Sequence, residues 1–273
     1  MKKRKRIIIL CAAALLLIGT YLFFYGHKPG ALKVPILMYH SVTAEETKAG
    51  RYTVTAEEFE SDMRWLSDHG YHTVFISDLE NYVRSGTPLP DKPVCVTLDD
   101  GYEDNLTLVL PILQKLDMKA TVSVVGNFSS DKSAGRTHLD WDDIRQMAAS
   151  GNIEIGNHTY AMHYNSSSGR RGCKQMAGES DGEYIAALES DLEKLQVELA
   201  EKSGVAPTVF TYPYGKISPL SETAVKSAGF GAALTTRPGM CWLSGDEEEL
   251  YHLPRFIRPS GIATSLFMLR LGI

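Results

Sequence analysis

Short apolar runs alternate with amphipathic stretches along most of the chain. Between most of these runs lie patterns typical of helices, with recognisable start signals. Strands that alternate with helices predict a parallel sheet with covered faces, and this number of strands in one unit favours a distorted (β/α) barrel. The sequence therefore predicts an α/β fold with about seven parallel strands. The runs that read as strands are 35–39, 73–76, 93–98, 120–125, 153–156, 208–212, 231–235 and 253–257.

Three helix signals are specific. Thr55 with Glu58 and Ser77 with Glu80 each have the spacing of a capping box, in which side chain and backbone cap each other at a helix start. The longest helical pattern covers residues 181–203. These signals predict where three helices begin.

The amino-terminal pattern differs from the rest. Residues 1–6 are mostly basic and residues 7–25 are almost entirely apolar, which predicts a cytoplasmic segment followed by a transmembrane signal-anchor. Residues 26–33 read as a linker and 34–273 as an extracellular domain. We expect a single-pass protein of the cell membrane with one N-terminal membrane helix, or a secreted protein if the segment is cleaved.

Charge narrows the class of partner. Five of the 28 basic residues lie in the first six positions, which leaves 23 basic residues against 33 acidic ones. This excess of negative charge argues against nucleic acid and against a polyanionic substrate, and suits a neutral glycan or one that becomes cationic. We expect a monomer. Cys95 reads as a core thiol, and a bridge between Cys173 and Cys241 remains one alternative.

Two adjacent carboxylates close one predicted strand. Asp99 and Asp100 follow the apolar run 93–98 in the sequence Thr-Leu-Asp-Asp-Gly. Carboxylates in such a place are costly unless paired or bound to a metal. The alternative is a turn with two solvated aspartates.

Two histidines follow another predicted strand. His158 and His163 are five residues apart. On a regular helix this spacing points the two side chains in different directions, so they can bind one ion only from an irregular loop. Two imidazoles with one carboxylate make the open, three-ligand arrangement of catalytic metal sites. Each histidine alone could equally be a surface or core residue.

Two further strand ends carry candidate chemistry. The turn 210–215, Phe-Thr-Tyr-Pro-Tyr-Gly, can aim a backbone N–H. His40 directly follows the run 35–39, where it could act as a general acid. The alternative for His40 is a core histidine. Together the motifs match metal-assisted amide hydrolysis.

The chain resembles the NodB-type polysaccharide deacetylases, carbohydrate esterase family 4. Residues 97–101 match that family's Thr-Phe-Asp-Asp-Gly block with Leu98 for Phe, and 158–163 match its His-Ser/Thr-x-x-His block with one extra residue. That longer spacing is similar to the poly-N-acetylglucosamine deacetylase branch. The resemblance covers roughly 34–260.

Two departures matter. The family's third block begins with an arginine that orients the base, and here that position is Thr211. The usual Leu-x-His block near the C-terminus is missing, which fits the circularly permuted branch, where this histidine comes from an N-terminal strand. Leu37 and His40 suit that role, and Arg255 is the candidate for the base-orienting arginine.

The resemblance implies a mechanism. Asp100, His158 and His163 would hold a divalent ion, zinc, while Asp99 acts as the base and His40 as the acid. The family's oxyanion donor, a backbone N–H, falls on Tyr214. The implied substrate is an N-acetylated polysaccharide of the cell surface, such as poly-N-acetylglucosamine, peptidoglycan or a chitin-like polymer, and the product is acetate.

Three alternatives stay open. An O-acetyl esterase on xylan or another wall glycan needs the same site but less help from an acid. A carbohydrate-binding protein with a dead site would not need the whole set of candidate residues. A glycosidase needs two carboxyl groups that flank the bond about 5 Å or more apart, for which Asp99 and Asp100 on one strand end are poorly placed.

Overall fold

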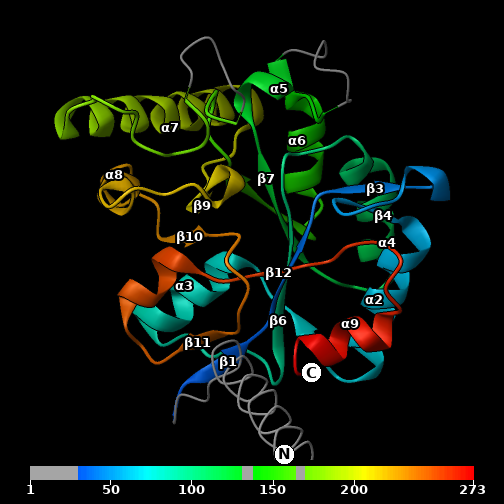
Figure 1. Ribbon diagram of the computed structural model, residues 1–273. Coiled ribbons are helices and arrows are strands. Elements are labelled where there is room, and N and C mark those ends of the chain that lie inside the picture. The colour runs from blue at the N-terminus through cyan, green and yellow to red at the C-terminus, as the bar shows by residue number, and fades with distance from the viewer. Residues whose placement is uncertain (1–29, 131–137, 164–169) are drawn as a thin grey trace, which may run out of the picture.

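The computed structural model describes residues 30–130, 138–163 and 170–273. Its centre is a curled sheet of seven parallel strands in the order β10-β9-β8-β7-β6-β2-β12, with β5 pairing to β6 beside this row (Figure 1). Each of the eight predicted strand runs overlaps one of these strands, although β5 shares only Thr73 with the run 73–76. The strands are β2 Ile36–Tyr39, β5 His72–Thr73, β6 Pro93–Leu98, β7 Ala120–Val124, β8 Ile153–Asn157, β9 Val209–Thr211, β10 Ala232–Leu234 and β12 Phe256–Ile257.

The two edges of the curled sheet meet through one short segment. Leu253 forms an isolated parallel bridge with Leu234 of β10, and three residues later β12 pairs with β2. Pro254 lies between the two pairings and has no N–H for a continuous ladder. The expected distorted barrel is therefore closed by a single bridge, and the expected strand 253–257 is split.

Two small sheets were not predicted. β1 Leu32–Val34 pairs antiparallel with β11 Cys241–Leu243, and β3 Ser41–Thr43 pairs parallel with β4 Thr53–Thr55. β1 therefore uses the last residues of the expected linker 26–33. The expected segments 1–6 and 7–25 lie outside the described residues. Among the residues described, no helix is long and apolar enough to cross a membrane.

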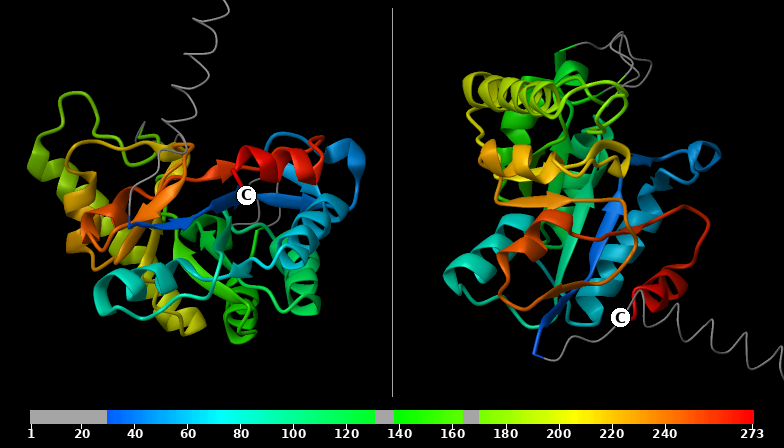
Figure 2. Two further views of the ribbon diagram at one scale, coloured as in Figure 1. Left: turned by 90° about the horizontal axis from the view of Figure 1, so that it is seen from below. Right: turned by 60° about the vertical axis from the view of Figure 1, so that its left-hand side comes forward.

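Helices lie around the outside of the curled sheet (Figure 2). The longest, α7, begins and ends where the pattern predicts, with a capping box at Ser180 and a left-handed Gly204 after its end. The helical elements are η1 Glu46–Lys48, α2 Ala56–Asp68, α3 Ile76–Ser85, η2 Asn105–Val109, α4 Leu110–Lys115, α5 Gly126–Ser130, α6 Trp141–Ala149, α7 Asp181–Ser203, η4 Pro213–Gly215, α8 Ser221–Ser227, η5 Glu247–His252 and α9 Thr264–Arg270.

The two predicted capping boxes had different outcomes. Thr55 and Glu58 cap each other at the start of α2, with N···O distances of 2.9 and 3.1 Å. The box at Ser77 is wrong, because α3 already begins at Ile76. Its first N–H groups, those of Ile76 and Ser77, donate to the carboxylate of Glu154 on β8. This distant side chain acts together with a local one, since Asp78 accepts from the N–H of Phe75 at 2.9 Å.

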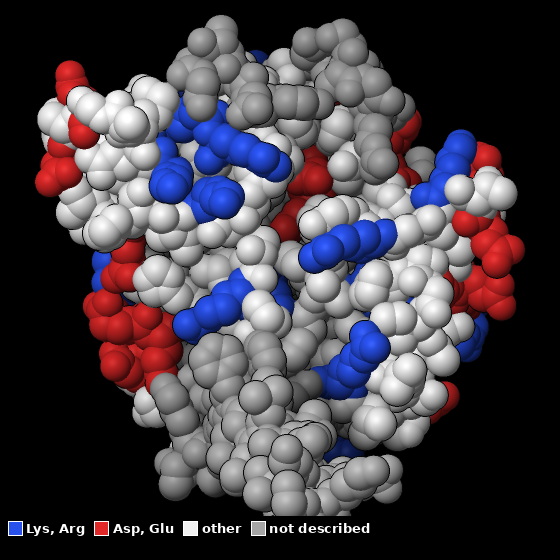
Figure 3. Space-filling view, viewed as in Figure 1, with Lys and Arg blue, Asp and Glu red and all other residues white. Residues whose placement is uncertain are grey.

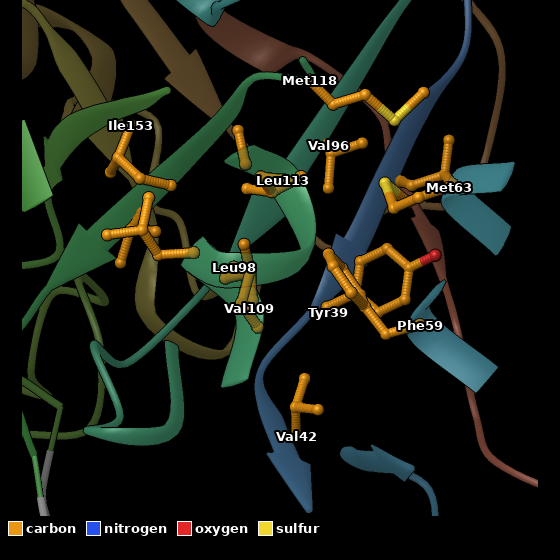
Figure 4. Packing of buried hydrophobic residues seen from close by; sticks show 14 of the residues in the cluster. Tyr39, Val42, Phe59, Met63, Val96, Leu98, Val109, Leu113, Met118 and Ile153 are labelled. Atoms are coloured by element: carbon orange, nitrogen blue, oxygen red, sulfur yellow. The ribbon is translucent and has the colours of Figure 1, made fainter. Parts of the chain in front are cut away.

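The core lies on both faces of the strands. On one face, Tyr39 of β2 packs edge-on against Phe59 of α2, with ring centroids 5.1 Å apart (Figure 4). The three cysteines of the described part, Cys95, Cys173 and Cys241, are buried thiols, and no disulfide joins them. The bridge between Cys173 and Cys241 is therefore absent, and both residues pack in the apolar core instead.

Candidate active site

The candidate residues gather at the carboxyl ends of neighbouring strands. β2, β6, β7, β8 and β9 run parallel and adjacent, so the residues that follow them meet at one edge of the sheet. The structure brings together all seven candidates from the sequence: His40, Asp99, Asp100, His158, His163, Tyr214 and Arg255.

Asp100, His158 and His163 form a cluster with the shape of a metal site. Their nearest ligand atoms all lie within 4.8 Å of one another, and Asp100 Oδ1 is 3.4 Å from His158 Nε2 and 2.9 Å from His163 Nε2. Within the described residues, this buried Oδ1 accepts no hydrogen bond. A cation between the three atoms would resolve this, because an unsatisfied buried carboxylate oxygen is costly.

The second ring nitrogen of His158 supports the same reading. His158 Nδ1 lies 2.7 Å from the backbone carbonyl of Thr211. A carbonyl only accepts, so Nδ1 carries the hydrogen, and the neutral ring with this hydrogen presents the lone pair of Nε2 toward Asp100. Metal-binding histidines are usually oriented in this way. Thr211 thus does not take the place of the missing arginine, but its carbonyl orients a candidate ligand.

A sharp turn aims the Asp100 carboxylate. Asp100 and Gly101 have φ of 74° and 67°, so the chain leaves β6 in the left-handed region. A Cβ on Gly101 would come within 2.9 Å of a Val124 methyl, which makes glycine necessary here. The hydroxyl of Tyr102 donates to Asp100 Oδ2 at 3.2 Å and so leaves Oδ1 for the histidines.

The loop that carries both histidines is irregular and anchored. Thr159 has φ of 72°, and its N–H donates to the side chain of Asn157 at 2.8 Å. The N–H groups of Tyr160 and Ala161 donate to the Asp191 carboxylate of α7, at 2.7 and 2.9 Å. Burial raises the pKa of Asp191. No local motif indicated this anchor. It shapes the loop so that His158 and His163, which are five residues apart, point to one place.

Asp99 is held by a fully buried arginine. Arg255 Nη1 and Nη2 each lie 2.7 Å from one oxygen of Asp99, and Arg255 Nε donates to the carbonyl of Thr235 at 2.8 Å. Burial alone would raise the pKa of Asp99, but the Arg255 guanidinium, with the charges of His40 and His158, holds the pKa below its ordinary value. Asp99 is therefore an oriented, ionised carboxylate beside the cluster.

His40 faces the same carboxylate from the other side. Its Nε2 lies 4.0 Å from Asp99 Oδ2, and its carbonyl accepts from Asn105 Nδ2 at 3.0 Å. Burial lowers the pKa of His40, while the charges of Asp99 and Asp100 oppose that shift. Its Nδ1 is buried and finds no hydrogen-bond partner among the residues described. An imidazole next to a carboxylate and a candidate metal site can serve as a proton donor.

Tyr214 covers the outer face of the cluster. It has φ of 58° inside η4, and its ring centroid is 4.6 Å from that of His163. Its hydroxyl also donates to the His163 carbonyl. The strained turn fixes the direction of the peptide at Tyr214, which is the group that the resemblance assigns to the oxyanion.

Comparisons with known proteins agree with this geometry. A sequence profile described as polysaccharide deacetylase matches residues 86–233, more than half of the chain. The protein YxkH of Bacillus subtilis (strain 168) is named after the same family and is 30% identical to this chain. The match covers 86% of this chain and 75% of the length of YxkH. The poly-beta-1,6-N-acetyl-D-glucosamine N-deacetylase of Escherichia coli (strain K12) is 27% identical over 81% of this chain, which spans only 36% of that relative's length.

Solved structures share the fold. IcaB from Ammonifex degensii superposes with a TM-score of 0.71 at 24% identity, over 88% of this chain and 96% of its own. The Streptococcus pyogenes deacetylase PplD superposes with a TM-score of 0.73 at 19% identity, over 88% and 99% of the two chains. The profile match and the identity to YxkH together go further than the fold: this chain belongs to the polysaccharide deacetylase family.

Proposed function

We propose that the protein is a metal-dependent N-deacetylase that releases acetate from an N-acetylated cell-surface polysaccharide. One observation carries the proposal: Asp99, held by Arg255, faces His40 and directly precedes Asp100 of the cluster with His158 and His163. A base, an acid and a candidate metal site are the groups that amide hydrolysis requires. The names of the relatives support the same reaction.

The residues divide the reaction between them. A divalent ion at the cluster supplies a Lewis acid for the acetyl carbonyl and makes water more acidic. Asp99 accepts the proton of the attacking water, and Arg255 keeps its carboxylate in place. His40, once protonated, donates to the sugar nitrogen, which otherwise leaves as an unfavourable amide anion. The peptide N–H of Tyr214 is the proposed donor to the developing oxyanion.

Further parts of the proposal come from the sequence. One carboxylate and two imidazoles suit zinc, which we propose as the native ion. The basic and apolar start of the chain supports a membrane-anchored domain outside the cell, and we propose that this domain works as a monomer. Poly-N-acetylglucosamine, peptidoglycan and chitin-like polymers are the candidate substrates.

The test is acetate release by the purified protein with zinc. It is assayed on oligosaccharides of β-1,6- and β-1,4-linked N-acetylglucosamine and of peptidoglycan, with O-acetylated xylan as the ester comparison. Release from at least one N-acetylated glycan supports the proposal. Release from the xylan alone would make the protein an esterase, and release from none would reject the deacetylase function.

We expect His158→Ala to lose most of the bound metal. The wild-type protein should hold about one divalent ion per chain, measured by atomic emission after dialysis, because three ligand atoms converge. His72→Ala is a matched control, since His72 is exposed and lies on β5 at the opposite end of the sheet. Full occupancy in His158→Ala would remove this residue from the ligand set.

A further inference from the structure

An exposed tyrosine lies against the proposed acid. Tyr52 precedes β4 and is 50% exposed, and its ring packs edge-on against His40 with centroids 4.9 Å apart. The guanidinium carbon of Arg51 lies 5.5 Å from the centroid of the Tyr52 ring. An arginine in this position is partly pre-ordered by the ring, so it loses less freedom when it binds an anion.

The same arrangement recurs at the proposed metal ligands. Tyr214 is 36% exposed and packs against His163, and the guanidinium carbon of Arg171 lies 4.5 Å from the centroid of the Tyr214 ring. One pair of arginine and tyrosine thus adjoins His40 and the other adjoins His163. The two pairs flank the reacting centre.

The position of Arg171 is built into the fold. The next residue, Gly172, donates its N–H to the carbonyl of Met162 at 2.8 Å. A Cβ on Gly172 would lie 2.7 Å from both the carbonyl of Pro213 and the side chain of Lys216, so this segment fits tightly against the turn that carries Tyr214. The segment and the turn line a hollow of about 650 Å³ that includes Arg171, Lys174 and Lys216.

Four basic side chains form what we call the cationic rim: Arg51, Arg171, Lys174 and Lys216. All four are exposed, and within the described ranges no carboxylate lies within ion-pair distance of any of them. By contrast, many basic residues on the helices, such as Lys202 of α7, are paired with acidic neighbours. In Figure 3, lysine and arginine side chains flank a hollow in which acidic atoms are visible, while other acidic groups lie toward the edges.

We propose that the cationic rim binds anionic groups, carboxylate or phosphate, on the sugars that adjoin the one being deacetylated. This inference rests on the proposed function and narrows its substrate to an anionic N-acetylated glycan. Arg51 and Arg171 contact the tyrosines beside His40 and His163, so they lie within reach of the neighbouring sugars. The overall negative charge of the chain argues for a neutral glycan, but the exposed charges of the cationic rim have the opposite sign.

The test compares three tetrasaccharides with one β-1,4 backbone. The first is neutral N-acetylglucosamine, the second carries a lactyl carboxylate on alternate sugars, and the third carries a 6-phosphate on alternate sugars. We expect kcat/KM for one of the charged substrates to exceed that for the neutral one by about tenfold at low salt, because two arginines each add a modest contact. The advantage should shrink as sodium chloride is added. The charged substrate that is preferred identifies the anion.

Variants then assign the effect to the rim. The double variant Arg51→Gln, Arg171→Gln should lose most of the ratio between charged and neutral substrate, and the double variant to lysine should retain more of it. Arg270→Gln is the control, because Arg270 is exposed at the end of α9 and lies outside the rim. It should leave the ratio unchanged.

The outcomes separate the inference from the function on which it rests. Equal kcat/KM on all three substrates, or a preference that survives both glutamine substitutions, overturns the rim while acetate release still supports the deacetylase. If no substrate releases acetate, the deacetylase proposal fails. Calorimetric titration with the charged tetrasaccharides then tests the rim by itself. Salt-sensitive binding that the double glutamine variant loses supports the rim. Absence of binding overturns it.

Discussion

Replacing Asp99 with asparagine is expected to lower the rate of acetate release by about 10²–10⁴-fold, the usual contribution of a positioned general base. The amide keeps the shape of the carboxylate but cannot accept a proton from water. Metal content should change little, because the atoms that converge at the cluster come from Asp100, His158 and His163. The measurement is kcat on an N-acetylated oligosaccharide together with metal analysis of the same sample.

The fully buried Arg255 makes a stability control necessary. The guanidinium pairs with both oxygens of Asp99, and removing one partner of a buried pair can cost about 3–5 kcal/mol. Urea unfolding of Asp99→Asn should therefore show a lower midpoint, with the protein still folded in the assay. Asn still offers one oxygen to Arg255. If the variant instead loses its metal, Asp99 shares in coordination and its role as the base is wrong.

His40→Ala is expected to separate amide from ester hydrolysis. The amine of an N-acetyl sugar must be protonated as it leaves, so this reaction should slow by about 10²-fold or more. An activated phenyl acetate has a leaving group that needs no proton, and its hydrolysis should be largely kept. Both rates are measured on one preparation of the variant.

His72→Ala again serves as the control and should keep both rates. Equal loss of both activities in His40→Ala would point to a structural role, since the His40 carbonyl also holds Asn105. Near-normal amide hydrolysis would remove His40 from the mechanism. Either result would leave the proposed metal site intact, because His40 contributes no atom to it.

The sequence predicted the strands well because their signals are local. Each buried strand is a short apolar run bounded by turn residues, and parallel strands place their carboxyl ends at one edge. The motifs at those ends therefore had to lie close together. The structure also pairs β2 with β12, because the first and last strands of a curled parallel sheet can be neighbours.

The contacts that aim these side chains could not be predicted in this way. Asp191 anchors the histidine loop from α7, and Glu154 caps α3 from β8, both across long separations in the chain. Arg255 was a candidate only through the absence of the family's arginine at Thr211. Its contact with Asp99 spans 156 residues, and no local pattern reports a pairing of that kind. Such contacts depend on the finished packing.

The closing segment of the sheet has a consequence for synthesis. Arg255 lies between the bridge at Leu253 and β12, and it follows His40 and both candidate histidine ligands in the sequence. A nascent chain that has already emerged past His163 still lacks the arginine that orients Asp99. Arg255 can orient Asp99 only when β12 docks beside β2. Catalytic competence should therefore arise in one late step, when β12 docks beside β2.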